Sequence, residues 1–399
     1  MFPQLVDKNT SVSLKRLQQH LAKCTKLSIG YPANLDFDYT LLLPFFQYYL
    51  NNVGDPFVEG NFALHSKEFE RQCINWFAQL YELEEYWGYL TSGGTEGNLY
   101  GIFLGRELNP DAILYSSSDT HYSVAKAARL LKIPHIVISS QFNGEINYEH
   151  LEYELSQRKH KSAIININLG TTMKGAVDNI ERIIEITQRV GVRFYIHCDG
   201  ALGGMLLPFI KEAPKISFRD YPIGSISVSG HKFIGSPIAY GIVLTRQPYV
   251  NKIETSVEYI GSQDTTILGS RSGIAALLLW YAIQTRSQHF QKEVASCLQN
   301  ARYLRDRLQE RNYHPLLNDF SITVVFDKPE IELCRKWQLA TEENLAHIVV
   351  MQHISTQKID LFIQNLLVNK QIKEIADEKL LTGNRKTMCV TILSSTSSL

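Results

Sequence analysis

The chain has 399 residues, which is enough for a large domain with a smaller one beside it. Hydrophobic residues make up 44% and charged residues 20%, a composition that excludes a disordered or fibrous protein. The 40 basic and 40 acidic side chains cancel, so no excess charge favours nucleic acid or an anionic membrane as a partner. We therefore expect a small-molecule ligand.

Cysteine usage and the first residues bear on metal binding and location. The six cysteines are scattered without C-x-x-C spacing, so neither a metal site nor a disulfide framework is expected. The first residues, MFPQLVDKNTSVSLKRL, lack the apolar stretch of a secretory signal, and no apolar run approaches the roughly 18 residues of a membrane span. The sequence predicts a cytoplasmic protein with reduced thiols.

The first part of the chain predicts an N-terminal arm over residues 1–50. Leu14, Leu17 and Leu21 recur at helical spacing, and Gly30, Tyr31 and Pro32 then break the pattern. Such an arm is expected to pack on a partner subunit. Farther on, residues 67–83 have helical spacing and residues 87–90 predict a short strand that ends at TSGGTEGN.

A large domain is predicted over residues 51–270. Short apolar runs alternate there with helical stretches, and they read AILYSS, HIVISS, AIININLG, FYIHCDGA, SISVSGHK and YGIVLTR. Strands buried on both faces and joined by helices indicate an α/β fold with a mainly parallel sheet. Ligands of such sheets bind beyond the carboxyl ends of the strands.

A small α+β domain is predicted over residues 271–375, with a tail over 376–399. Its expected elements are one long amphipathic helix over 276–308, a strand at SITVVF, and a helix over 358–368. The chain ends in SSTSSL, which is typical of a loosely held terminus.

The run Ser229, Gly230, His231, Lys232 follows the predicted strand SISVS. A lysine that forms a Schiff base must be partly desolvated, which lowers its pKa, and must be reachable by an aldehyde. A turn at a strand end provides both conditions. Taken alone, a lysine after a strand is more often a solvated surface residue, so its companions carry the argument.

Polar groups at other strand ends fit pyridoxal 5′-phosphate (PLP). Asp199 is suited to hold a proton on the pyridine nitrogen, although it could also cap the next helix. Thr91–Thr95 combines hydroxyls, glycines and a helix start into an anion site for a phosphate, and it matches neither a Walker loop nor GxGxxG. His121 could stack on the cofactor ring, and Thr171 and Thr172 offer hydroxyls to its phenolic oxygen.

Together these motifs resemble a known family. The set TSGGTEGN, DTHYSVAKAARLL, NLGTT, HCDGA and SVSGHKFIGSP is similar to the group II amino-acid decarboxylases of PLP fold type I. More narrowly, it resembles the branch that holds plant serine decarboxylases and bacterial PLP-dependent histidine decarboxylases. The resemblance runs from about Gly30 to Leu367. It implies an obligate homodimer in which the arm and the segment near Ser270 and Arg271 complete the partner's site.

The resemblance also implies roles for individual residues. The catalytic residues would be Lys232, which forms the Schiff base, His121, which stacks on the ring, and Asp199, which pairs with the pyridine nitrogen. Ala201 would pack on the other ring face and Thr172 would reach the phenolic oxygen. The phosphate would be held by Ser92, Gly93, Gly94, Thr95, Ser229 and His231, and the substrate contacts would be Tyr31, Phe62 and His289.

The stretches NNVGDPFVEGNFALHSKEFE, WQLATEENLAHIVVMQ and FQKEV fit the plant serine decarboxylase pattern better, which favours L-serine as substrate and ethanolamine as product. Three positions depart from that pattern. Phe62 replaces a tyrosine, which could favour alanine as substrate or simply form a wall. Ser272 and Ile274 replace the Asn and His of SRNGH. The loop before FQKEV lacks a proton-donating tyrosine, which leaves His289 or His121 to return the proton to Cα.

Other functions remain open at this stage. Within the class, the chain could decarboxylate histidine to histamine. A PLP aminotransferase would need an arginine clamp for the substrate carboxylate, whereas a decarboxylase leaves that group unpaired. A hypothesis from a different class is a non-catalytic protein with the PLP fold. Absence of a visible cofactor band together with absence of turnover would favour it.

Overall fold

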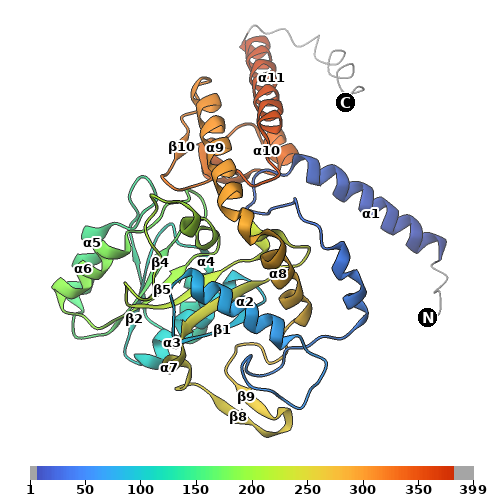
Figure 1. The fold of residues 1–399 in the computed structure, drawn as a ribbon. Helices are drawn as coiled ribbons and strands as arrows, with labels where there is room; N and C mark the ends of the chain where they lie inside the picture. Colours follow the sequence, from blue (N-terminus) through green and yellow to red (C-terminus); the bar gives the residue numbers. More distant parts are fainter. Residues whose placement is uncertain (1–6, 382–399) are drawn as a thin grey trace.

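The computed structural model describes residues 7–381 (Figure 1). These residues form a seven-stranded sheet with the order β1-β7-β6-β5-β4-β2-β3. The strands are β1 (Tyr86–Thr91), β2 (Ile113–Ser117), β3 (His135–Ile138), β4 (Ala163–Asn168), β5 (Phe194–Asp199), β6 (Ile223–Val228) and β7 (Gly241–Arg246). Strand β7 runs antiparallel to both of its neighbours, and the other pairs are parallel. The mainly parallel sheet and the α/β fold class are therefore confirmed.

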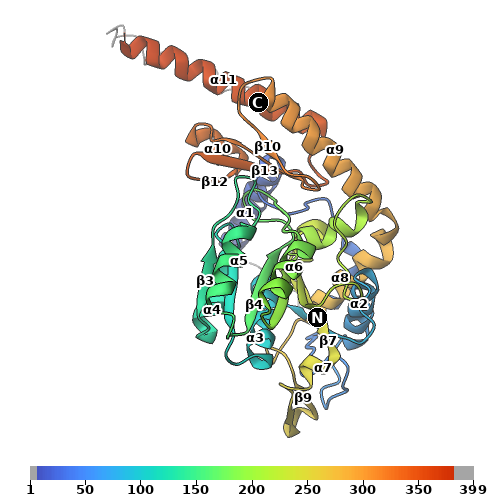
Figure 2. The same cartoon turned by 90° about the vertical axis from the view of Figure 1, so that its left-hand side faces the viewer.

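Helices cover both faces of this sheet because its strands are apolar on both sides. Along β4, Ile164 belongs to the core beneath α3 (Gly94–Leu108) and α4 (Tyr122–Leu131), whereas Ile165 belongs to the core on the opposite face. That second face is covered by α2 (Lys67–Leu80), α5 (Tyr148–Gln157), α6 (Ile180–Val190) and α8 (Gly273–Arg286). Figure 2 shows the sheet between its helices in side view. This double burial makes the strands nearly continuous hydrophobic runs.

Short elements complete this part of the chain. The 3-10 turns are η1 (Thr40–Gln47), η2 (Gly203–Met205), η3 (Leu207–Phe209) and η5 (Glu258–Ile260). A π-helical turn, η4 (His231–Gly235), follows β6, and α7 (Gln247–Val250) follows β7. Strands β8 (Thr255–Val257) and β9 (Ser262–Asp264) pair as a separate hairpin.

The C-terminal part has its own antiparallel sheet, in the order β10-β11-β13-β12. Its elements are α9 (Phe290–Gln309), β10 (Leu316–Leu317), β11 (Thr323–Asp327), α10 (Ile331–Trp337), β12 (Ala340–Glu342), β13 (Leu345–Val349) and α11 (Thr356–Leu381). A separate hydrophobic core lies between this sheet and these helices, around Trp337 and Phe362. The strand predicted at SITVVF is confirmed as β11.

Two predicted helices differ from those observed. The single helix predicted over 276–308 is interrupted by the 3-10 turn η6 (Ser287–His289), which separates α8 from α9. The helix predicted over 358–368 lies within α11, which continues beyond residue 375. The rest of the predicted tail, 382–399, lies outside the described residues, and the domain boundaries remain a prediction.

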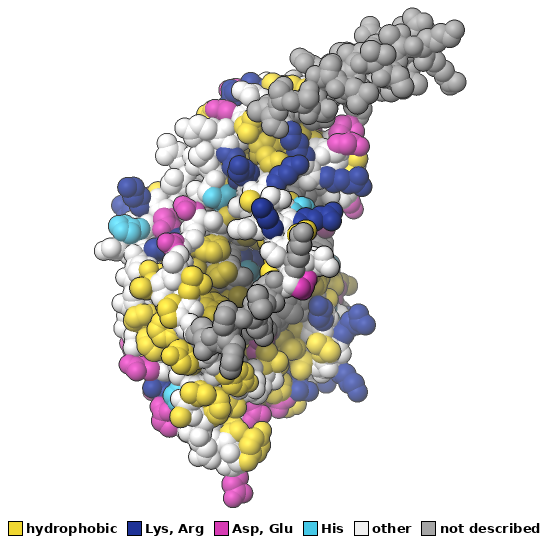
Figure 3. All heavy atoms as spheres, turned by 90° about the vertical axis from the view of Figure 1, so that its right-hand side faces the viewer, with side chains coloured by type: hydrophobic (Ala, Val, Ile, Leu, Met, Phe, Trp, Pro, Cys, Tyr) yellow, Lys and Arg dark blue, Asp and Glu magenta, His cyan; other side chains and the backbone are white. Residues whose placement is uncertain are grey.

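The N-terminal helix α1 (Lys8–Leu27) extends away from the body of the molecule (Figure 1). Leu14, Leu17 and Leu21 lie on it as the helical pattern predicts, and all three are more than half exposed. Figure 3 shows hydrophobic side chains gathered on the face of the molecule from which α1 projects. Within residues 7–381, none of the helices combines the length and the apolar composition that crossing a membrane requires.

Candidate active site

A cavity of about 430 Å³ opens at the carboxyl ends of the parallel strands. Nearly all of the predicted site residues line it, although they come from loops far apart in the sequence. These are Tyr31, Ser92, Gly93, Gly94, Thr95, His121, Thr172, Asp199, Ala201, Ser229, His231 and Lys232. The fold therefore brings the predicted groups into one cavity. Phe62 and His289 do not line it.

Lys232 lies in the π-helical turn η4, directly after β6. The turn is anchored on both sides, since Asn34 N–H donates to the Lys232 carbonyl at 3.0 Å and Lys232 N–H donates to the Ser229 carbonyl at 3.3 Å. Burial lowers the pKa of the Lys232 amine, against an opposing effect of Asp199. A lysine of this kind has a larger neutral, nucleophilic fraction than a surface lysine.

Asp199 is the last residue of β5 and is only 7% exposed. One carboxylate oxygen, Oδ2, accepts from Asn98 Nδ2 at 2.6 Å, and the other, Oδ1, accepts from Ala201 N–H at 3.1 Å. Because both donors are fixed by the protein, the carboxylate has a defined orientation at the cavity wall. It is suited to face a positively charged ring nitrogen.

The predicted anion cradle lies at the N-terminus of α3. Gly93 has φ of 153° and ψ of 177°, a conformation that glycine adopts far more readily than other residues. A β-carbon on Gly94 would lie 2.7 Å from Ser229 Oγ, so a side chain there would fill the cradle. The first N–H groups of a helix lack intrahelical partners. These residues therefore fit a phosphate group.

His231 completes the cradle from the side of β7. Its Nδ1 lies 2.7 Å from the Tyr240 carbonyl oxygen, which can only accept, so Nδ1 carries the proton and donates. The ring also lies against Gly93, because a β-carbon at that position would be 4.0 Å from His231 Cε1. Nε2 is then the nitrogen available to a bound anion.

His121 is the N-cap residue of α4. Its Nδ1 accepts from Ser123 N–H at 3.3 Å and lies 2.8 Å from Ser123 Oγ. Burial lowers the pKa of His121, Asp199 raises it, and Lys232 lowers it. The imidazole shares the cavity wall with both other catalytic candidates.

The two candidate threonines at the end of β4 have different environments. The Thr171 hydroxyl accepts from Ala176 N–H at 3.0 Å and is occupied by its own turn. Thr172 is exposed and lines the cavity. The arrangement favours Thr172 as the residue that reaches a ligand.

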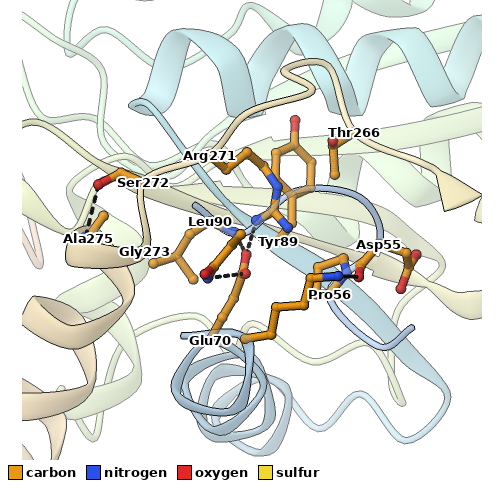
Figure 4. Close-up of polar contacts among 12 residues, drawn as sticks. Asp55, Pro56, Glu70, Tyr89, Leu90, Thr266, Arg271, Ser272, Gly273 and Ala275 are labelled. Carbon is orange, nitrogen blue, oxygen red and sulfur yellow. Dashed lines mark hydrogen bonds and ion pairs between the residues drawn. The ribbon is translucent and has the colours of Figure 1, made fainter. Parts of the chain in front are cut away.

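Three residues singled out in the sequence lie elsewhere. Phe62 packs edge-on against Tyr49 with ring centroids 6.1 Å apart, and His289 is exposed at the end of η6. Figure 4 shows Arg271 and Glu70 of α2 pointing toward each other, and Glu70 accepting from Leu90 N–H. Because the Arg271 side chain is buried in this ion pair, any contribution of its segment to a partner falls to exposed neighbours such as Ser270.

The two departures beside Arg271 have local structural roles. Ser272 Oγ accepts from Ala275 N–H at 3.2 Å and caps α8, as Figure 4 shows. Ile274 is partly buried against the main core. Both residues therefore support the start of α8.

Sequence reasoning did not find the wall that the C-terminal part contributes to the cavity. This wall consists of Phe320, Ser321, Thr323, Ala340, His347 and Val349. Phe320 has φ of 61°, a conformation that is unfavourable for a bulky side chain. Asn318 holds the Phe320 loop in place by donating to the carbonyls of Asn143 and Lys174 at 2.7 and 2.9 Å. The positive φ of Phe320 is the structural feature that marks this wall, and the sequence does not reveal it.

The fold and the cavity together define a PLP-binding enzyme of fold type I. A family profile described as "Pyridoxal-dependent decarboxylase conserved domain" matches residues 104–328. The chain belongs to this pyridoxal-dependent decarboxylase family, and it is a PLP-dependent carboxy-lyase that acts on an amino acid.

Similar curated proteins include serine decarboxylases and histidine decarboxylases. The chain is 49% identical over 355 residues to serine decarboxylase 1 of Oryza sativa subsp. japonica, with 88% of this chain and 73% of the relative covered. It is 46% identical over 377 residues to histidine decarboxylase of Solanum lycopersicum, with 92% and 91% covered.

Among solved structures, L-methionine decarboxylase from Streptomyces sp.590 superposes with a TM-score of 0.83 at 26% identity. The superposition covers 92% of this chain and 96% of that one. Glutamate decarboxylase of Lactobacillus brevis, at 19% identity and a TM-score of 0.76, shares the fold.

Proposed function

We propose that the protein decarboxylates a small L-amino acid, with L-serine as the substrate and ethanolamine and carbon dioxide as products. The observation that carries this proposal is the convergence of Lys232, Asp199, His121 and the anion cradle on one cavity. The rice serine decarboxylases, at 48–49% identity, support the choice of serine.

When bound, PLP supplies a conjugated ring that accepts the electron pair of the breaking bond between Cα and the carboxylate. Lys232 would hold the cofactor aldehyde, and Asp199 would keep a proton on the pyridine nitrogen. His121 and Ala201 would bracket the ring. Thr172 would donate to the phenolic oxygen.

The phosphate would be held by the cradle residues and by His231. Gly93–Thr95 offer backbone N–H groups, and Ser92 and Thr95 offer hydroxyls, whereas Ser92 N–H donates to Glu96 Oε2 at 2.7 Å. Ser229 lies across from Gly94. Burial lowers the pKa of His231, so its Nε2 atom would donate to the phosphate only where the charge of the dianion outweighs that effect and protonates the ring. This arrangement uses every cradle residue that the sequence predicts.

His121 is the better of the two candidates for returning the proton to Cα. It lines the cavity, whereas His289 is exposed and lies outside it. Its environment leaves Nε2 as the nitrogen that carries the proton, as the hydrogen bonds to Nδ1 require. A general acid must reach the reacting atom directly or through one water.

Tyr31, Phe62 and His289 were predicted as substrate contacts. Tyr31 lines the cavity and supports that role. Phe62 would have to reach the cavity of a second copy of the chain, and His289 has no support from its position. The wall around Phe320 and His347 is a further candidate for contact with the substrate side chain.

Competition among amino acids tests the substrate. Purified protein with PLP is incubated with equal concentrations of L-serine, L-alanine and L-histidine, and the amines are identified by mass spectrometry. Ethanolamine should predominate. Predominance of histamine would favour the second candidate, histidine decarboxylation. That candidate is supported by the tomato histidine decarboxylase, because the match to this chain covers 91% of that enzyme. Predominance of ethylamine would favour alanine and an apolar role for Phe62.

We also propose that the enzyme works as a cytoplasmic homodimer. Support for the dimer comes from exposed apolar side chains on the N-terminal segment, including Leu41, Leu43 and Tyr49 at 61–69% exposure. Burial of such a surface is the usual driving force of stable association. The five cysteines of the described residues are free thiols, which is compatible with a reducing compartment.

A further inference from the structure

In the wall of the cavity, a buried chain of hydrogen bonds joins Asp199 to His121. Its centre is Asn98, which lies in α3 and is 1% exposed. Asn98 Nδ2 lies 2.6 Å from Asp199 Oδ2 and 2.9 Å from Ser123 Oγ. Asn98 Oδ1 lies 3.0 Å from His197 Nε2. One side chain thus contacts three polar groups at once.

The direction of each hydrogen bond follows from the chemistry of the groups. The Asp199 carboxylate can only accept, so the amide nitrogen of Asn98 must face it. The second amide hydrogen donates to Ser123 Oγ. The Ser123 hydroxyl then donates its own hydrogen to His121 Nδ1 at 2.8 Å. Since Ser123 N–H also donates to Nδ1, the ring proton of neutral His121 is on Nε2.

The other end of the chain is consistent with the same direction. Asn98 Oδ1 can only accept, so His197 Nε2 carries a proton and donates to it. His197 Nδ1 accepts from Ser225 Oγ at 2.8 Å, and Ser225 Oγ accepts from the Tyr195 hydroxyl at 2.8 Å. Burial lowers the pKa of His197 to about 4, so the ring is neutral, as this pattern requires.

Close packing of α3 on the sheet makes the contacts possible. A β-carbon on Gly101 would lie 2.1 Å from His197 Nδ1, and one on Gly97 would lie 2.1 Å from Ser227 Oγ. The helix therefore approaches β5 and β6 through glycines on both sides of Asn98 in the sequence. The same helix carries the anion cradle at its N-terminus.

We propose that Asn98 is a positioning residue that couples Asp199 to His121, fixing the carboxylate that faces the cofactor nitrogen and holding the imidazole as its Nε2–H tautomer. This assignment rests on the proposed roles of Asp199 and His121. Asn98 itself does not need to touch a reacting atom. Its effect reaches the chemistry through the two residues that it orients.

Two variants separate the branches of this network. Asn98→Ala removes both donors, whereas Ser123→Ala removes only the branch to His121 and leaves the hydrogen bond to Asp199. Asn52→Ala is a matched control, because Asn52 is also 1% exposed and donates to a buried carboxylate, Glu70 Oε2, at 2.8 Å, but does not line the cavity.

The first measurement is made on the cofactor-free protein with ¹⁵N-labelled histidine, with the His121 signal assigned by its loss in His121→Asn. Wild type and Asn52→Ala should show a single His121 tautomer with the proton on Nε2. Ser123→Ala and Asn98→Ala should show a smaller Nε2–H fraction, because the shorter hydroxyl contact to Nδ1 is lost or no longer fixed and the backbone N–H of Ser123, at 3.3 Å, is left to hold the tautomer. A single unchanged tautomer in Ser123→Ala would overturn the proposal, even if Asn98→Ala failed to fold.

The second measurement is the dissociation constant of PLP, obtained by titrating the cofactor-free protein and following the visible band. Asn98→Ala should weaken PLP binding by roughly tenfold or more, because Asp199 loses the shorter of its two fixed hydrogen bonds. Asn52→Ala should lower stability and leave PLP binding unchanged. Equal PLP affinity in both variants would show a purely structural role and overturn the proposal. Neither readout needs turnover, so a wild type that binds PLP without decarboxylating serine would refute only the proposed function.

Discussion

The buried ion pair between Glu70 and Arg271 makes a sharp stability prediction. The Glu70 side chain is 0% exposed and that of Arg271 is 3% exposed. Glu70 also accepts from Leu90 N–H at 2.9 Å and from Asn52 Nδ2 at 2.8 Å, and Arg271 Nη2 donates to the Gly54 carbonyl at 3.0 Å. Arg271→Met would leave the buried carboxylate without its ion-pair partner, which costs about 3–5 kcal/mol. Glu70→Leu should cost a similar amount, because it leaves the arginine unpaired.

The double variant should be much less destabilised than the sum of the single ones. Replacing both partners removes the uncompensated charge and leaves mainly the two orphaned donors, Leu90 N–H and Asn52 Nδ2, at about 1–3 kcal/mol each. Free energies of unfolding are measured by denaturant titration at fixed protein and PLP concentrations. Arg189→Met is the matched control, because its pair with Glu152 is exposed and screened by solvent, and should contribute little to stability. A double variant as unstable as the sum, or an Arg271→Met no worse than the control, would refute the reasoning.

Three further predictions concern acid stability, selectivity and assembly. Burial lowers the pKa of His197 to about 4 from the ordinary 6.5, so the unfolded chain binds a proton more readily than the folded one. Roughly 3 kcal/mol of stability should therefore be lost as the pH falls from 6.5 toward 4. His197→Gln should flatten this part of the curve of unfolding free energy against pH. Phe320→Gly should raise kcat/KM for histidine relative to serine, because it opens the cavity wall and because glycine adopts the φ of 61° without strain. An unchanged ratio would exclude Phe320 from selectivity. Leu43→Asp should shift sedimentation from dimer to monomer, and an unchanged dimer would place the interface elsewhere.

Much of the site could be predicted from the sequence because each group lies at the end of a strand. Lys232, Asp199 and His121 each follow an apolar run, and parallel strands bring their carboxyl ends to one edge of a sheet. The anion cradle is predictable for a similar reason, since glycines and hydroxyls precede a helix start. The local pattern therefore contained both the residue types and their common location.

Other features depend on tertiary contacts that no local pattern contains. The helical periodicity continues through residues 287–289, where the structure has a 3-10 turn. Beside this turn, Arg286 donates to the Ile234 carbonyl and pairs with Glu293, and these contacts are invisible in the local pattern. The wall around Phe320 comes from a loop of the second sheet. Asn98 was visible within TSGGTEGN, but its contacts with Asp199 and Ser123 depend on how closely α3 packs on the sheet.

The most direct test of the account follows the carboxylate of L-serine labelled with ¹³C at C1. Purified protein with PLP should release labelled carbon dioxide and ethanolamine in equal amounts, and Lys232→Ala should lose both this turnover and the visible cofactor band. Formation of a keto acid in place of carbon dioxide would contradict decarboxylation. Undiminished carbon dioxide release by Lys232→Ala would contradict the assignment of the active site.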